Sequence, residues 1–308
     1  GVEYQESKGD TSFEGISKIE LEFLEIVPDL MRKKFRVLVR DLFPKLEEEA
    51  IKLHIKKSIC ATKFSPTINF NSLFELAKND CEKIIFIQKQ FEEMMNEIIN
   101  QAEFMGLKDS FFLHISPNLG TKDGKEIIKI STPNDIGSTD IQLLLKGATK
   151  DAGVLCLLNK FLGKTKGKMP FGEGFNFRDC PESLEEKIML CKSLIKKEDM
   201  PLIIGVGDTV TSQKNKKGND YSRGGSDRSF LELIQALGNE YNINNKVVFV
   251  DSSDGEVFRP STKENSLAGI TDKDDKLKFN IIFQNGSKEY NNWFINIANK
   301  RFEIKNKN

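Results

Sequence analysis

Two aspartates, Asp208 and Asp227, are the residues of this chain with the clearest capacity for chemistry. Asp208 follows Gly207 at the end of the apolar run 201–206, which is typical of a strand buried on both faces of a parallel sheet. Ligands of open α/β sheets bind outside the carboxyl ends of the strands. A carboxylate at that edge is a candidate ligand for Mg²⁺, which one or two carboxylates normally hold together with phosphate oxygens and water. The plain alternative is an ordinary Gly-Asp turn after a core strand.

Asp227 is the candidate for a second carboxylate at the same edge. Residues 213–225 are polar and rich in glycine, so we expect a loop that leaves the strand end and returns to it. A helix then begins within 226–231 and carries Asp227 in its first turn. The alternative is an acid that only stabilises the helix N-terminus, by about 0.5 kcal/mol, and both explanations can hold together.

Lys150 is a third candidate, because it opens a predicted helix, where a cation is mildly unfavourable against the helix dipole. A lysine in that position suggests an anion nearby. A solvated lysine is the commoner explanation in general, so the case for Lys150 depends on the two aspartates.

Helices and strands alternate from about residue 146 onward, which predicts a parallel sheet wrapped by helices. The predicted helices span 150–162, 184–196 and 227–237, the last one ending at Gly238, and a second strand spans 246–251. Asp208 and Asp227 then stand at a strand end and at a helix start beside it.

The first hundred residues are predicted to be mostly helical. Capping-box patterns occur at 17–20 and 72–75, and apolar residues recur at helical spacing from Phe74 until Gly106. A strand at 109–115, a stretch dense in turn formers and a strand at 126–130 predict a hairpin with a long loop.

Composition narrows the function classes. The 308 residues suffice for about two domains, and 46 basic and 46 acidic residues cancel, which removes the electrostatic footprint of nucleic-acid binding. Five cysteines without a CxxC pair favour neither a zinc site nor a disulfide framework and fit a reducing cytoplasm. No apolar segment approaches the ~20 residues of a membrane span, so no membrane partner is expected.

Three of these segments resemble motifs of the haloacid dehalogenase superfamily of phosphatases, in the group with a large cap domain inserted into the core. Residues 150–154 follow the family's helix-opening lysine, Gly207-Asp208 matches its strand end, and 226–231 match the helix that begins with a second aspartate. In that family the second aspartate comes four residues after the first. Position 212 is Ser here, so an insertion separates the two acids.

This resemblance implies an α/β fold. It consists of the C-terminal half of a haloacid-dehalogenase-like core, with a Rossmann-like parallel sheet, and an α+β cap domain with a large helical insertion. Residues 1–145 would form the cap, with a β-hairpin around 110–131, and residues 146–308 would form the C-terminal part of the phosphatase core.

Longer blocks resemble one branch of the superfamily, the glucosylglycerol 3-phosphate phosphatases. These blocks are 19–24, 65–69, 110–128, 150–158, 201–213, 223–228 and 250–253. The branch implies Mg²⁺-dependent hydrolysis of the sugar phosphate to glucosylglycerol, a compatible solute of salt-stressed photosynthetic bacteria, through an aspartyl-phosphate. Asp208 and Asp227 would hold the Mg²⁺, and Lys150 would pair with the phosphate.

The resemblance also implies where the substrate and partners would bind. Substrate contacts are expected from His114, Asn118 and Lys122 on the cap hairpin and from Arg223. For His114, a satisfied core histidine is the main alternative. The implied partners are the small sugar phosphate and the glucosylglycerol-phosphate synthase, with no nucleic acid and no membrane.

One departure from the family is severe. The family's nucleophile is the first aspartate of an Asp-x-Asp-Gly motif, and this chain contains no such motif. The Ser or Thr that binds the phosphate in the family also has no match here. Residues 251–255 only imitate the motif, because their acids are three positions apart. We therefore expect an N-terminally truncated fragment, inactive alone, with about 100 residues missing. The alternatives are a non-catalytic sugar-phosphate-binding or regulatory protein, and a phosphatase of sucrose phosphate or mannosyl-phosphoglycerate.

Overall fold

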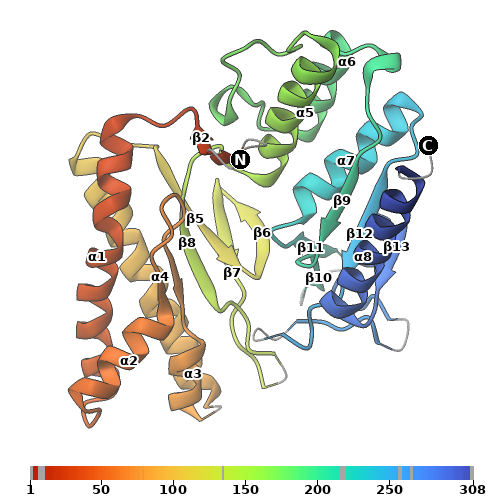
Figure 1. Ribbon diagram of the computed structural model, residues 1–308. Helices are drawn as coiled ribbons and strands as arrows, with labels where there is room; N and C mark the ends of the chain where they lie inside the picture. The colour runs from red at the N-terminus through yellow and green to blue at the C-terminus, as the bar shows by residue number, and fades with distance from the viewer. Residues whose placement is uncertain are drawn as a thin grey trace. The chain divides into compact units, whose positions relative to one another are not determined.

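The computed structural model of the protein describes residues 3–5, 11–78, 80–133, 135–215, 220–255, 259–263 and 266–305. The chain divides into two compact units, Gly1–Ile195 and Lys196–Asn308 (Figure 1). The expected division into a cap and a core at residue 145 stays a prediction. Helices α5 (Lys150–Lys166) and α6 (Leu184–Leu194) and the short 3-10 helix Phe177–Asp179 group with the first unit.

An antiparallel sheet in the order β3-β4-β8-β5 organises the first unit. Its strands are Ile59–Cys60, Thr67–Asn69, Asp140–Leu145 and Phe111–Ser116 for β3, β4, β8 and β5. Side chains alternate between the faces, so Ile141 and Leu143 are fully buried on one face while His114 pairs with Gln142 on the other. The sheet therefore has an apolar face and a more polar one.

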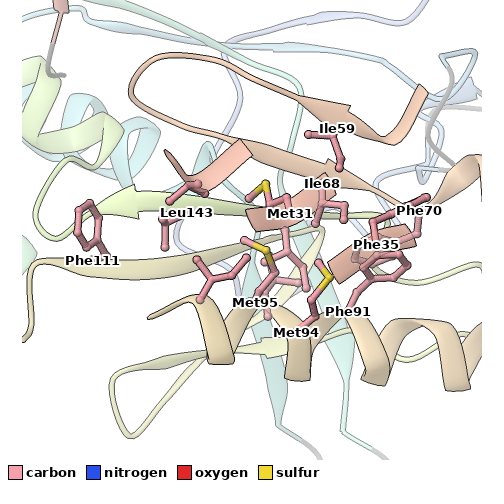
Figure 2. Close-up of a cluster of buried hydrophobic side chains, with 14 of the residues drawn as sticks. Met31, Phe35, Ile59, Ile68, Phe70, Phe91, Met94, Met95, Phe111 and Leu143 are labelled. Atoms are coloured by element: carbon pink, nitrogen blue, oxygen red, sulfur yellow. The ribbon is translucent and has the colours of Figure 1, made fainter. Parts of the chain in front are cut away.

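Helices from the first 104 residues supply the apolar partner of that sheet. They are α1 (Lys18–Leu42), α2 (Glu48–Ser58), α3 (Asn71–Ala77) and α4 (Cys81–Phe104). Figure 2 shows Phe35 of α1 beside Phe91 of α4, with Met31 of α1 in the same buried cluster. The Phe70 and Phe91 rings stack at 4.7 Å, so the Met and Phe stripe is core packing. The predicted capping box at Ser17 is confirmed.

The single helical period expected from Phe74 to Gly106 is wrong, because the chain forms two helices there. Lys78 adopts a left-handed conformation and ends α3, and Asp80 accepts a hydrogen bond that caps α4. The predicted capping box at 72–75 is wrong as well. The Ser72 hydroxyl bonds instead to Ser58 at 2.8 Å and joins two helices inside the core.

The predicted hairpin exists, but its strands are different. Strands β6 (Asn118–Lys122) and β7 (Lys125–Ile128) pair with each other across Asp123-Gly124, whereas β5 pairs with β8. Both turn residues have positive φ, which is the conformation that an Asp-Gly hairpin turn requires. A further hairpin joins β1 (Glu3–Gln5) and β2 (Thr11–Phe13).

The second unit is built on a parallel sheet in the order β13-β12-β9. Its elements are the 3-10 helix Lys197–Asp199, β9 (Ile204–Gly207), β10 (Thr211–Lys214), β11 (Tyr221–Gly224), α7 (Arg228–Tyr241), β12 (Lys246–Val250), β13 (Ile281–Phe283) and α8 (Gly286–Lys305). The predicted parallel sheet with helices is confirmed in this mixed α/β unit (Figure 1).

Alternation along the strands assigns the two long helices to opposite faces. Gly205 and Gly207 face α7, since a Cβ on Gly205 would lie 2.6 Å from Ile234. Val206 and Val248 point the other way and pack with Tyr290 of α8. Glycine on β9 thus allows α7 to approach the strand closely.

Two details of these elements differ from expectation. Leu202 and Ile204 are 56% and 54% exposed, so the first half of the run before Asp208 is not buried on both faces. Within the described sheet, β9 pairs only with β12 and forms an edge. Helix α7 passes through Gly238, where a Cβ would lie 3.0 Å from Asn245, and ends at Tyr241.

No helix of the described residues combines the length and the apolar composition that crossing a bilayer requires.

Candidate active site

The carboxyl ends of β9 and β12 bring together the polar residues of the second unit. Asp208 directly follows β9, and Asp251 directly follows β12, whose Phe249 pairs with Gly207. The Asp208 side chain is 44% exposed, whereas Asp251 is only 5% exposed. Asp208 therefore lies at the strand end that the sequence pattern predicts and is the more accessible of the two carboxylates, and its role as a ligand stays a prediction.

Asp227 lies beneath Asp208 and supports it. Its Oδ2 accepts the backbone N–H of Asp208 at 2.8 Å and that of Thr209 at 2.9 Å, and its own N–H donates to the Thr209 carbonyl at 3.0 Å. Asp227 precedes α7 but makes no side-chain cap bond to that helix. Asp227 therefore does not cap α7 by a side-chain hydrogen bond, but its place at the helix start still allows the favourable interaction with the helix dipole. The two predicted acids are in direct contact.

The Asp208 carboxylate is itself paired. Its Oδ1 accepts the Thr209 hydroxyl at 2.9 Å, and its Oδ2 accepts Arg259 Nη1 at 2.7 Å. Burial raises the pKa of Asp208, but the Arg259 charge and the hydrogen bonds outweigh burial and hold the pKa below its usual range. The group is ionised at neutral pH, which is the form that binds a cation.

Asp251 fastens the loop that carries Arg259. Its Oδ2 accepts the Thr262 hydroxyl at 2.7 Å and the Ser261 hydroxyl at 3.1 Å, and its Oδ1 accepts the Ser253 N–H at 2.8 Å. Burial raises the pKa of Asp251, yet these hydrogen bonds lower it well below its usual range. This acid, in the segment that imitates the nucleophile motif, holds both ends of a loop.

The hairpin β10–β11 replaces most of the loop expected at 213–225, of which residues 216–219 lie outside the described residues. The chain does leave the strand end and return to it, since Asp227 meets Thr209. Arg223 on β11 binds Asp272 with Nε at 2.8 Å and Nη2 at 2.7 Å. Arg223 is a predicted substrate contact, but the Nε and Nη2 atoms that could bind a substrate both donate to Asp272.

A buried ion pair fixes the start of α7. Arg228 binds both carboxylate oxygens of Asp275, at 3.1 and 2.9 Å, and donates to the Thr211 carbonyl at 3.2 Å. Both side chains are less than a tenth exposed. Arg228 directly follows Asp227, so its bonds to Asp275 and Thr211 also fix the position of Asp227 beside β9.

The predicted sugar contacts lie in the first unit and share one partner. Glu126 Oε1 binds His114 Nδ1 at 2.8 Å, and Glu126 Oε2 accepts from Asn118 Nδ2 at 2.9 Å and from the Ile115 N–H at 2.7 Å. Lys122, at the end of β6, is exposed. The structure brings His114 and Asn118 together through an acid that the motif reading missed.

Lys150 is the first residue of α5, as predicted, and is exposed in the first unit. Its neighbour Asp151 is 6% exposed and binds Lys187 of α6 at 2.7 Å. Lys187 also donates to the Glu182 carbonyl at 2.7 Å. The helix start that carries Lys150 is therefore tied to α6 by a buried ion pair.

At the carboxyl ends of the strands in the second unit, one side chain has the properties of a Mg²⁺ ligand. Asp208 offers an accessible, ionised carboxylate, and the nearby donors are oxygens of Thr209 and Ser252. Within the described ranges, no group of three or more His, Cys, Asp or Glu side chains is arranged around a cation position. Such a site would need phosphate oxygens and water as its other ligands, as is usual for Mg²⁺.

Sequence reasoning missed Arg259, the cation bound to Asp208. Arg259 lies in a polar loop without a recognisable motif. Its only signal was position, since it follows β12, the strand that neighbours β9.

Comparison with known proteins adds an independent line of evidence. A family model described as glucosylglycerol-phosphate phosphatase matches residues 1–298. A glucosylglycerol-phosphate phosphatase from Synechocystis sp. is 38% identical over 313 residues, which cover 98% of this chain and 74% of that relative. Among solved structures there is no significant match. On the whole-length family match and this identity, the chain belongs to the glucosylglycerol-phosphate phosphatase family.

Proposed function

We propose that this chain acts in a phosphatase that hydrolyses glucosylglycerol 3-phosphate to glucosylglycerol and phosphate. The observation that carries the proposal is the exposed Asp208 carboxylate at the end of a parallel strand, in a chain of this family. The superfamily fold, a haloacid-dehalogenase-like core with residues 1–145 as cap and 146–308 as the C-terminal part of the core, is part of the proposal.

The second unit supplies the charged edge for phosphoryl chemistry. Asp208 is the ligand for Mg²⁺, with Asp227 beside it, and Asp227 keeps the strand end in place through two amide hydrogen bonds. When bound, Mg²⁺ neutralises charge that develops on the phosphoryl group. Lys150 pairs with phosphate oxygens.

The nucleophile comes from an aspartate outside these residues, because the chain contains no Asp-x-Asp-Gly motif. Its carboxylate attacks phosphorus, the sugar alcohol leaves, and water then cleaves the resulting aspartyl-phosphate. The 308 residues alone are expected to be inactive.

The sugar binds over the polar face of the first unit's sheet, near His114, Asn118 and Lys122. The shared partner Glu126 supports this proposal, because it orients the first two side chains. Arg223 is the less favoured contact, since Asp272 already occupies its fork. A cytoplasmic role in compatible-solute synthesis under salt stress, next to the glucosylglycerol-phosphate synthase, completes the proposal.

Phosphate release tests this function directly. The protein extended upstream to include an Asp-x-Asp-Gly segment should release phosphate from glucosylglycerol 3-phosphate with Mg²⁺, faster than from sucrose phosphate or mannosyl-phosphoglycerate. Asp208→Asn should lower turnover by about a hundredfold or more. Binding of the sugar phosphate without turnover would instead support a regulatory binding protein. Turnover by the 308 residues alone would contradict the assignment of the nucleophile.

A further inference from the structure

Of the three guanidinium nitrogens of Arg259, Nη1 bonds to residues at the carboxyl ends of β9 and β12. Its Nη1 donates to Asp208 Oδ2 at 2.7 Å and to Ser252 Oγ at 3.1 Å, and it also contacts the Thr209 hydroxyl. Among the described residues, Nε and Nη2 have no hydrogen-bond partner. The side chain is 20% exposed, and within the described residues neither of these nitrogens counts as a buried atom that lacks a partner.

Position and orientation of this side chain are both held. The loop that carries it is fastened through Asp251, which binds Ser253 near its start and Thr262 near its end. At the other end of the side chain, three oxygen-bearing residues hold Nη1. A guanidinium held in this way loses little conformational entropy when its remaining donors bind a ligand.

The Nε–Nη2 edge of Arg259 is suited to binding oxyanions. Nε and Nη2 point the same way and carry parallel N–H groups, which match two oxygens of a phosphate or carboxylate. Within the part of the chain that the structure describes, Asp208 is the one acid bound to Arg259, and it binds Nη1 on the opposite edge. The fork is therefore available to an anion that lies beside the Asp208 carboxylate.

We propose that Arg259 binds the phosphoryl group of the substrate through its Nε–Nη2 edge while Nη1 stays on the strand end. This inference rests on the proposed function, because it places the scissile phosphate beside Asp208. It adds a residue that none of the sequence motifs includes. Two adjacent N–H donors would bind two phosphoryl oxygens and leave the third free for a cation.

The proposal predicts that removing the Arg259 charge changes the affinities for phosphate and for Mg²⁺ in opposite directions. Removing the Arg259 charge removes phosphate donors, so phosphate should bind less tightly. The same change removes the positive charge next to Asp208, so Mg²⁺ should bind at least as tightly as before. A residue that only maintained the loop would weaken both when it was replaced.

The test is calorimetric titration of the 308-residue chain with inorganic orthophosphate and, separately, with Mg²⁺. Arg259→Gln should weaken orthophosphate binding by about tenfold or more, and Arg259→Lys should fall between, because it keeps the charge without the fork. Lys263→Gln is the matched control. It removes one positive charge from the same loop, where Lys263 pairs with exposed Asp254 at 2.7 Å, and it should change neither affinity.

Several outcomes would overturn the inference. Orthophosphate affinity that is equal in Arg259→Gln and the unaltered chain would do so, as would the absence of orthophosphate binding by the unaltered chain. Parallel loss of Mg²⁺ and orthophosphate affinity would assign Arg259 a structural role. Failure of the proposed function is separate: it would appear as no phosphate release by the extended protein, whatever the effect of Arg259→Gln on orthophosphate binding.

Discussion

The Asp227 carboxylate accepts the backbone N–H of Asp208 at 2.8 Å, although the two residues are 19 positions apart. The same Oδ2 atom accepts the N–H of Thr209 at 2.9 Å. Asp227 is 3% exposed and Thr209 is 4% exposed, so water has little access to the acceptor and to the second of these amides. The second acid of the motif thus determines the backbone course that presents the first one.

Replacing Asp227 tests this support. Asp227→Ala leaves one buried and one partly buried amide without an acceptor, which should lower the free energy of unfolding by about 2–4 kcal/mol. Asp227→Asn keeps one oxygen acceptor and should cost about 1 kcal/mol. Urea unfolding measures both values. Asp254→Asn, at an exposed acid that pairs with Lys263, should stay within about 0.5 kcal/mol of the unaltered chain. An Asp227→Ala protein as stable as that control would contradict the support role.

Gly207, together with Gly205, lets α7 lie close to β9. A Cβ at this position would be 2.8 Å from Asp227 Cβ and 3.0 Å from Leu231 Cδ1. Gly207→Ala should therefore push the start of α7 away and lower the free energy of unfolding by about 1–3 kcal/mol. Gly174→Ala is the control, because nothing lies within 4 Å of a Cβ there. Equal unfolding curves for the two variants would contradict this packing.

Part of this site could be predicted from the sequence because its signals are local. An apolar run that ends in Gly207-Asp208 predicts a strand end, and the alternation of helices with strands predicts a parallel sheet, so the place of Asp208 follows. The helix with Asp227 at its start follows from the same pattern. What Asp227 does with its carboxylate could not be predicted, because its partners are amides that only the tertiary fold brings near.

The strand pairing in the first unit shows what local sequence patterns do not predict. Strand β5 is expected to pair with the strand that follows it, but its partner is β8, because pairing between consecutive strands is a tendency that tertiary packing can override. The tight hairpin has a local signal in Asp123-Gly124, a pair typical of two-residue hairpin turns, whereas the density of turn formers around it predicts a longer loop. Arg259 had no local signal at all, since its role depends on a loop that returns to the neighbouring strand.

The buried ion pair between Asp151 and Lys187 predicts a large effect of a single substitution. The atoms are 2.7 Å apart, and the residues are 6% and 5% exposed. Lys187→Met would leave Asp151 charged and unpaired, which should lower the free energy of unfolding by about 3–5 kcal/mol. The double variant with Asp151→Leu should recover much of this loss. Denaturant titrations of the two single variants and the double variant measure the coupling.

An exposed pair provides the contrast for this experiment. Lys52 and Glu49 are 2.6 Å apart on α2, with side chains 53% and 82% exposed. Lys52→Met should change stability by no more than about 0.5 kcal/mol. If Lys187→Met were equally harmless, the pair would not hold α5, and the position of Lys150 would need another explanation.

His54 predicts how the stability of the chain depends on pH. The residue is 8% exposed on α2, and its Nδ1 has no hydrogen-bond partner among the described residues. Burial lowers the pKa of His54 below its ordinary 6.5, the Lys57 charge lowers it further, and Glu75 opposes them. Below pH 6.5 the unfolded chain then takes up a proton that the folded chain refuses. The free energy of unfolding should therefore fall as the pH drops through this range.

Urea unfolding at several values between about pH 7 and pH 5 measures this dependence. His54→Phe should flatten the slope, since the variant cannot take up that proton in either state. The chain has only 2 histidines, so His114→Asn is the matched variant, and it should keep the share of the slope that His54 causes. An unchanged slope in His54→Phe would mean that the buried imidazole is protonated in the folded chain as readily as in the unfolded one.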